Sequence, residues 1–205
     1  MPKSKSSRRW LQEHHSDNFV KAAREQGYRS RASFKLIELD DRERLLRPGA
    51  CVVDLGAAPG GWSQVAAARV GHKGRVVASD ILPMAAVAGV EFIQGDFTDE
   101  AVVQALRECL NGPADLVISD MAPNMSGVAS VDTIKALYLV ELALDLASEV
   151  LAPGGSFICK AFHGAGYDDW LRTVRAQFKQ VAVRKPSASR SRSRETYVVA
   201  RGFKA

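Results

Sequence analysis

Cysteine is scarce in this chain, which has only three among 205 residues, at positions 51, 109 and 159. Because the number is odd and the positions are far apart, the sequence predicts neither a disulfide framework nor a zinc knuckle. The adjacent His14 and His15 have no second pair of ligands, so no metal site is predicted. We therefore expect a protein without metal in a reducing compartment, the cytoplasm.

A long uncharged hydrophobic run is also missing. The most apolar long segment, residues 133–151, contains Lys135, Glu141, Asp145 and Glu149, which a membrane-spanning helix would not readily tolerate. The first nine residues are polar and basic, and no apolar stretch follows them as in a signal peptide. We expect neither export nor contact with a membrane, and we take a monomer as the default.

Acidic residues are almost absent from residues 172–205, where one acidic residue accompanies ten lysines and arginines. Residues 1–50 hold 12 basic and 7 acidic residues, whereas residues 51–171 hold 6 basic and 15 acidic residues. A single basic run is usually a solvated surface. Two basic flanks around an acidic centre instead favour contact with a polyanion such as nucleic acid.

Short apolar runs alternate with longer amphipathic stretches from residue 50 onward. The expected strands are residues 50–55, 74–79, 90–93, 115–119, 156–159, 180–183 and 197–200. The expected helices are residues 33–46, 62–70, 100–110, 133–151 and 167–178. This alternation predicts an α/β fold, in which helices cover both faces of a mostly parallel sheet.

A glycine-rich turn follows the first expected strand and reads GAAPGG over residues 56–61. The dinucleotide fingerprint G-x-G-x-x-G requires a close glycine pair, which this turn lacks. Pro59 also removes a backbone N–H group that a bound phosphate would need. The turn therefore disfavours a nucleotide-dependent oxidoreductase and favours a cofactor without phosphates.

Aspartates follow several of the expected strands, and ligands bind at these carboxyl ends in a doubly wound sheet. Asp80 is placed to accept hydrogen bonds from ribose hydroxyls, and Asp96 from an adenine amino group. Asp120 is placed to meet the cationic part of S-adenosylmethionine. Taken alone, each aspartate is better explained as a helix N-cap or a turn residue, and only their combination indicates a cofactor site.

Five motifs together resemble the FtsJ/RrmJ family of ribose 2′-O-methyltransferases, which act on bacterial large-subunit ribosomal RNA. They are YRSRASFKL (28–36), DLGAAPGGWSQ (54–64), SDMAPN (119–124), FICK (157–160) and SRSRETY (191–197). The resemblance covers nearly the whole chain. It implies a single-domain Rossmann-like methyltransferase fold with a seven-stranded sheet, whose last strand runs antiparallel.

The resemblance implies S-adenosyl-L-methionine as cofactor and assigns its binding to Gly60, Trp62, Asp80, Asp96 and Asp120. For Trp62, simple packing at the start of a helix is an equally good explanation.

The resemblance also implies a catalytic set of Lys35, Asp120, Lys160 and Glu195. In our hypothesis, Lys160 accepts the hydroxyl proton or orients the hydroxyl, and Asp120 positions Lys160 beside the methyl donor. Lys35 and Glu195 hold the ribose. The alternatives are an exposed lysine at a strand end for Lys160 and a surface ion pair with a neighbouring arginine for Glu195.

The family further implies ribosomal RNA as partner, within the large subunit, and a uridine as target. We expect residues 1–32 to form a basic, RNA-contacting extension and residues 33–205 to form the methyltransferase domain. The arginines expected to contact RNA phosphates are Arg8, Arg9, Arg24, Arg29, Arg31, Arg190, Arg192 and Arg194. Methylation of transfer RNA or of an RNA cap, and a non-catalytic ribosome-assembly factor, are the alternatives.

Overall fold

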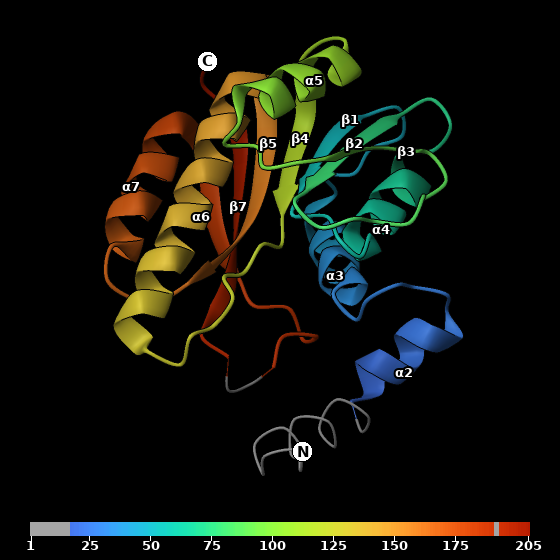
Figure 1. The fold of residues 1–205 in the computed structure, drawn as a ribbon. Helices are drawn as coiled ribbons and strands as arrows, with labels where there is room; N and C mark the ends of the chain where they lie inside the picture. Colours follow the sequence, from blue (N-terminus) through green and yellow to red (C-terminus); the bar gives the residue numbers. More distant parts are fainter. Residues whose placement is uncertain (1–16, 191–192) are drawn as a thin grey trace.

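A computed structural model describes residues 17–190 and 193–205 of the chain. In this part of the chain, helices and strands alternate from β1 to α7, except that β3 follows β2 directly, and two final strands come after α7 (Figure 1). The helices are α2 (Asn18–Glu25), α3 (Ser33–Glu43), α4 (Gly61–Val70), α5 (Glu100–Leu110), α6 (Ala129–Val150) and α7 (Tyr167–Gln177). The strands are β1 (Cys51–Leu55), β2 (Arg75–Asp80), β3 (Val90–Gln94), β4 (Ala114–Ser119), β5 (Leu151–Phe162), β6 (Phe178–Arg184) and β7 (Glu195–Phe203).

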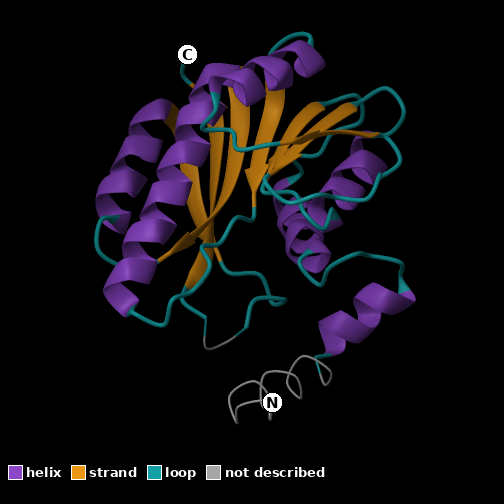
Figure 2. Cartoon of the chain, viewed as in Figure 1, coloured by secondary structure: helices purple, strands orange, loops and turns teal. Residues whose placement is uncertain are grey.

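The strands form one sheet in the order β3-β2-β1-β4-β5-β7-β6. Strands β1 to β5 pair in parallel, and β7 pairs antiparallel with both β5 and β6. Figure 2 shows this single sheet between its layers of helices. The expected mostly parallel, seven-stranded α/β fold with an antiparallel last strand is thus confirmed.

The central strands are hydrophobic on both faces because helices cover both faces. Alternate residues of β1 show this, since Val53 packs in the core beneath α5, α6 and α7, whereas Val52 packs in the core beneath α3 and α4. In Figure 1, α6 and α7 lie side by side over one face of the sheet, and α3 and α4 lie on the other. The fold therefore has three layers and two hydrophobic cores.

Two helix boundaries differ by three or four residues from those predicted, and side-chain hydrogen bonds explain both. Helix α3 ends at Glu43 because Arg44 adopts a left-handed conformation with φ 52°. The buried Asp40 carboxylate then accepts hydrogen bonds from the next two backbone N–H groups, those of Leu45 and Leu46. Helix α6 begins at Ala129, four residues early, where Asp132 accepts hydrogen bonds from the preceding loop.

Helix α2 was not predicted from the sequence. Its N-cap is Asp17, whose side chain accepts a hydrogen bond from the Phe19 N–H group. Only Val20 and Ala23 of this eight-residue helix are buried, so its hydrophobic pattern is too short to be recognised. No helix in residues 17–190 or 193–205 is both long and apolar enough to cross a membrane.

A buried charge cluster joins the end of α3 to the last two strands. The Glu43 carboxylate accepts hydrogen bonds from Arg184 on β6, at 2.7 Å, and from Arg201 on β7, at 2.5 Å. Burial raises the pKa of Glu43, but the hydrogen bonds from the two arginines outweigh it and lower the pKa below its ordinary value of 4.5. The carboxylate is therefore more stable in the folded protein than in the unfolded chain.

Glu43→Gln should lower the free energy of unfolding at neutral pH by about 1–3 kcal/mol, the usual contribution of hydrogen bonds to charged groups. Because folding lowers the pKa, the carboxylate stabilises the protein above pH 4.5 and loses this effect as the pH falls below it. Urea unfolding across this pH range should show that the difference in free energy of unfolding between wild type and variant becomes smaller as the pH falls. Glu141→Gln, at an exposed position, is the control. A difference in free energy of unfolding that does not change with pH would contradict the stabilising role of the Glu43 carboxylate.

Candidate active site

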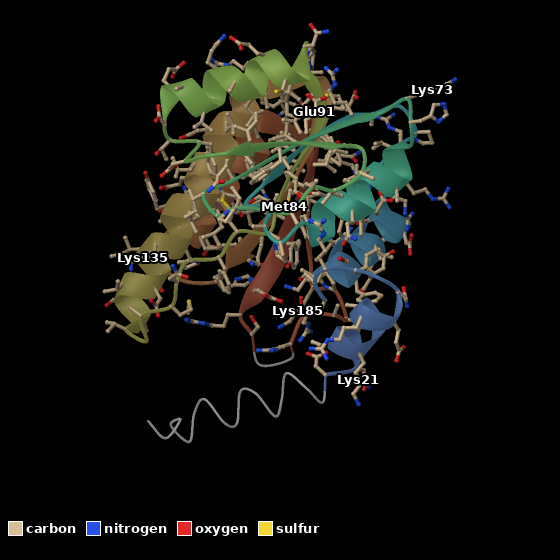
Figure 3. All side chains as sticks on the ribbon, turned by 45° about the vertical axis from the view of Figure 1, so that its right-hand side comes forward. Lys21, Lys73, Met84, Glu91, Lys135 and Lys185 are labelled. Carbon is tan, nitrogen blue, oxygen red and sulfur yellow. The ribbon has the colours of Figure 1, made fainter. Side chains whose placement is uncertain are left out.

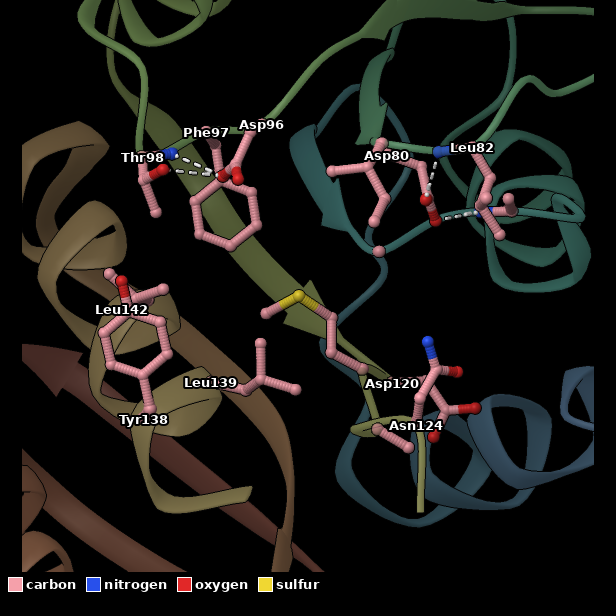
Figure 4. A pocket seen from close by; sticks show the side chains of 15 residues that line it. Asp80, Leu82, Asp96, Phe97, Thr98, Asp120, Asn124, Tyr138, Leu139 and Leu142 are labelled. Atoms are coloured by element: carbon pink, nitrogen blue, oxygen red, sulfur yellow. Dashed lines mark hydrogen bonds between the residues drawn. The ribbon is translucent and has the colours of Figure 1, made fainter. Parts of the chain in front are cut away.

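A cavity of about 400 Å³ opens at the carboxyl ends of β1 to β4 (Figure 4). It is called the cofactor cavity below. Its lining comes from the glycine turn, from the residues that follow β2, β3 and β4, and from the side of α6. The lining residues are Gly56, Ala58, Asp80, Ile81, Leu82, Asp96, Phe97, Thr98, Asp120, Met121, Ala122, Asn124, Tyr138, Leu139 and Leu142.

Among the described residues, three carboxylates and no lysine or arginine line the cofactor cavity. Asp80 accepts hydrogen bonds from the Ala58 and Leu82 N–H groups, one on each oxygen, both at 2.8 Å. Asp96 accepts from the Thr98 N–H and hydroxyl groups on a single oxygen (Figure 4). Both aspartates thus stabilise turns and also face the cavity, where their remaining lone pairs can accept hydrogen bonds from a ligand. The turn explanation is therefore correct for both aspartates, while their role in ligand binding stays a prediction.

The turn after β1 comes very close to the residue that follows Asp120. Gly56 has φ +69°, and a Cβ atom placed on it would lie 2.2 Å from Cγ of Met121. A glycine is needed here both for its backbone conformation and for this approach. Next to this turn, the fully buried Asp54 accepts a hydrogen bond of 2.6 Å from the Ser63 hydroxyl. Burial raises the pKa of Asp54 to about 7.

Gly60 and Trp62 do not line the cofactor cavity. Gly60 is the N-cap of α4, with φ 103°. Trp62 is 3% exposed, packs against Tyr197 and donates a hydrogen bond from Nε1 to the Ala32 carbonyl oxygen. It lines a recess of about 70 Å³ that shares Gly56, Ala58 and Asp120 with the cofactor cavity. The packing explanation for Trp62 is therefore correct, while its position by the recess still allows contact with a ligand.

All four residues of the expected catalytic set lie together, with Asp120 at the centre. Lys160 is buried, and its ammonium nitrogen lies 3.1 Å from Oδ1 of Asp120 and 2.5 Å from the backbone oxygen of the same residue. The Lys35 ammonium lies 3.0 Å from Oε1 of Glu195 and 3.9 Å from Oδ1 of Asp120. Lys160 is therefore no ordinary exposed lysine, and Glu195 pairs with Lys35.

Tyr197 completes this cluster, and the sequence did not identify it as a site residue. Its fully buried hydroxyl donates a 2.6 Å hydrogen bond to Oδ1 of Asp120 and accepts one of 2.8 Å from Lys35. Burial, and then the negative charges of Asp120 and Glu195, raise the pKa of Tyr197 well above its ordinary value. The tyrosine is therefore a neutral donor. Its position two residues after Glu195, on the same face of β7, was the available signal.

Several of the expected RNA-contacting arginines have internal partners. Arg29 donates to the carbonyl oxygens of Pro59, Ala85 and Ala86. Arg31 forms an ion pair with Asp17. These two residues hold the N-terminal segment against the domain. Arg8, Arg9 and Arg192 lie outside the described residues.

Lysines lie at both ends of the molecule. Figure 3 shows Lys21, Lys135 and Lys185 at the end where the central strands finish, and Lys73 at the opposite end. Basic side chains from α2, α6 and the segment before β7 therefore lie at the same end as the cluster around Asp120.

Comparisons with known proteins agree with this geometry. A family model described as FtsJ-like methyltransferase matches residues 28–203. The chain is 62% identical to a Ribosomal RNA large subunit methyltransferase E of Marinobacter nauticus, over 100% of this chain and 99% of that protein. It is 63% identical to the protein of the same name from Cellvibrio japonicus, over 99% and 97%. A crystal structure described as a ribosomal RNA methyltransferase from Plasmodium falciparum matches with a TM-score of 0.78, at 28% identity over 86% of this chain and 98% of that one.

Tyr197→Phe should destabilise the protein, because it removes a buried hydroxyl that links Lys35 to Asp120 and leaves both without this partner. We expect a loss of about 1–3 kcal/mol in the free energy of unfolding, measured with urea. Tyr138→Phe is the matched control, since the Tyr138 side chain is 54% exposed and its variant should unfold like wild type. Equal stability of the two variants would contradict the bridging role of the hydroxyl.

Proposed function

Because the chain belongs to the FtsJ-like methyltransferase family, we propose that it methylates the 2′-hydroxyl of a ribose, in a uridine of large-subunit ribosomal RNA. Two relatives that match it over almost their full length are named for the large subunit RNA. The observation that carries the proposal is the convergence of two buried lysines on Asp120, at the edge of a cavity lined by carboxylates.

The lining of the cofactor cavity fits S-adenosylmethionine, which would supply an electrophilic methyl group on a positively charged sulfur. We assign Asp80 to the ribose hydroxyls of this cofactor, Asp96 to its adenine amino group and Asp120 to its cationic part. The absence of lysine and arginine from the lining disfavours a cofactor with phosphates and therefore the oxidoreductase alternative. Asp80 and Asp96 form no ion pair with any described residue, and their negative charge favours a positively charged ligand.

The catalytic cluster can bind a hydroxyl and accept its proton. In our proposal, Asp120 holds the side chain of Lys160 in place from two oxygens, so that the free amine lone pair faces the ribose hydroxyl. Lys35 and Glu195 bind the ribose.

Two alternatives concern the substrate and the activity. A non-catalytic assembly factor would not need Lys35, Asp120, Lys160 and Glu195 to remain together, as they do here. Methylation of transfer RNA or of an RNA cap would use the same chemistry, and mapping of the transferred methyl group distinguishes these substrates. The cytoplasmic location, the monomeric state and the boundary between residues 32 and 33 stay predictions.

Lys160→Ala should lower the rate of methyl transfer by about 10²–10⁴-fold, the usual contribution of a positioned acid or base. The measurement is incorporation of label from radiolabelled S-adenosylmethionine into unmodified large ribosomal subunits, with the label mapped to a ribose. Lys73→Ala, at an exposed position at the opposite end of the molecule (Figure 3), is the matched control and should transfer at the wild-type rate. Near-normal transfer by Lys160→Ala would refute its assigned role, and label found only in transfer RNA would refute the substrate.

Gly56→Ala should weaken cofactor binding at least about tenfold, because the added methyl group would displace Met121 into the cofactor cavity. Gly71→Ala is the control, because Gly71 has a similar φ of +67° but nothing within 4 Å of the added atom. The two variants therefore share the backbone strain and differ only in the clash. Isothermal titration with S-adenosylmethionine should separate them, and equal affinities would show that the contact with Met121 is unimportant.

A further inference from the structure

A second cavity, of about 490 Å³, adjoins the cluster around Asp120. It is called the target cavity below. Its lining residues are Arg31, Ala32, Lys35, Ala122, Met125, Phe162, Arg190, Ser193 and Glu195. Ala122 also lines the cofactor cavity, so the two cavities meet at the segment that follows Asp120. A molecule in the target cavity would touch Lys35 and Glu195 directly.

We propose that the target cavity binds the nucleotide to be methylated, with its base against Met125 and Phe162 and its phosphate at Arg190. This inference rests on the proposed function and extends it to the residues that hold the substrate. In Figure 1, the loop after β4 and the segment before β7 lie at the same end of the molecule, below the ends of β4 and β5. RNA can therefore approach the cavity from solvent.

Most polar side chains of the target cavity already have partners. Lys35 and Glu195 form an ion pair at 3.0 Å, and Arg31 is held by Asp17 and by the Ala188 carbonyl oxygen. The Ser193 hydroxyl accepts a hydrogen bond from the Glu195 N–H group. These groups shape the cavity and position the ribose, but they leave few hydrogen-bonding atoms for the edge of a base.

Two of the other lining residues, Met125 and Phe162, are apolar and suit the face of a nucleobase. Met125 is 65% exposed and belongs to the loop after β4. Phe162 ends β5, and its ring centroid lies 6.0 Å from the Lys160 ammonium nitrogen. An aromatic ring can stack on any base, and a thioether adapts to flat apolar surfaces. A base held here would keep its ribose close to the catalytic lysines.

Arg190 adds a positive charge to the same cavity and has no ion-pair partner among residues 17–190 and 193–205. A guanidinium group binds phosphate oxygens well, often through two hydrogen bonds. An apolar surface, a ribose-binding ion pair and a cation in one cavity correspond to the base, sugar and phosphate of a nucleotide. A peptide would not require this combination beside a methyl-transfer site.

This arrangement has a consequence for specificity. Stacking holds a base without reading its edge, whereas discrimination between bases requires hydrogen bonds. The enzyme should therefore need a base at the target position but tolerate the exchange of uridine for cytidine. The choice of nucleotide then comes from contacts with the surrounding RNA.

Binding can be measured without catalysis, because methionine methyl groups report on both cavities. Met121 lines the cofactor cavity and Met125 lines the target cavity. In protein labelled with ¹³C at the methionine methyl groups and saturated with S-adenosylhomocysteine, uridine and cytidine monophosphate should both shift the Met125 resonance. Ribose 5-phosphate should leave the Met125 resonance unchanged, and none of the three ligands should shift the Met121 resonance. If the nucleotides left the Met125 resonance unchanged, or shifted the Met121 resonance instead, the proposal would be overturned.

Turnover on unmodified large subunits tests the stacking residue. Phe162→Ala should raise KM about tenfold, as expected for the loss of one base–aromatic contact, whereas Phe162→Tyr should retain the wild-type KM. Val183→Ala, at an exposed position on β6, is the control. If Phe162→Ala does not fold, Met125→Ala in the exposed loop replaces it, with an expected rise in KM of at least twofold.

An unchanged KM in folded Phe162→Ala, or an equal loss in Phe162→Tyr, would overturn the role of stacking. Failure of wild type to label any ribose would refute the proposed function instead, and the Met125 resonance would still decide whether the cavity binds a nucleotide.

Discussion

The Asp120 carboxylate is the group on which the site depends. Two lysines and a tyrosine from three different elements converge on its Oδ1 atom. A carboxylate removed from water requires partners, and cations removed from water require a carboxylate. Neither the buried carboxylate nor the buried lysines would be stable without the other, so their mutual attraction keeps them together at the junction of the two cavities.

The sheet order explains how this convergence arises from distant parts of the chain. Asp120 follows β4, Lys160 lies on β5, and Tyr197 lies on β7, and these three strands are neighbours in the sheet. The register pairs Lys160 directly with Tyr197. Lys35 arrives from α3, on one face of the sheet. The antiparallel direction of β7 brings its first residues to the same edge as the carboxyl ends of β4 and β5, which a parallel strand would not do.

Much of the fold and of the candidate site could be predicted from the sequence, and the features that could not be predicted have physical reasons. Strand positions followed from apolar runs, and Asp80, Asp96 and Asp120 followed from their places after strands, which a doubly wound sheet brings to one edge. Pairing partners were not readable, because the contact between Lys35 and Tyr197 spans 162 positions. The engagement of Arg29 by backbone carbonyl oxygens was hidden for the same reason, since charge counts do not show which cations are already bound.

The position of β7 also governs when the protein becomes active during its synthesis. This strand contains Glu195 and Tyr197, forms last in the chain, and inserts between β5 and β6 rather than adding to an edge. A nascent chain that has completed β6 still lacks Glu195 and Tyr197, two of the three described residues that pair with Lys35, and leaves β5 unpaired on one side. The group of residues around Asp120 is therefore complete only after β7 has inserted.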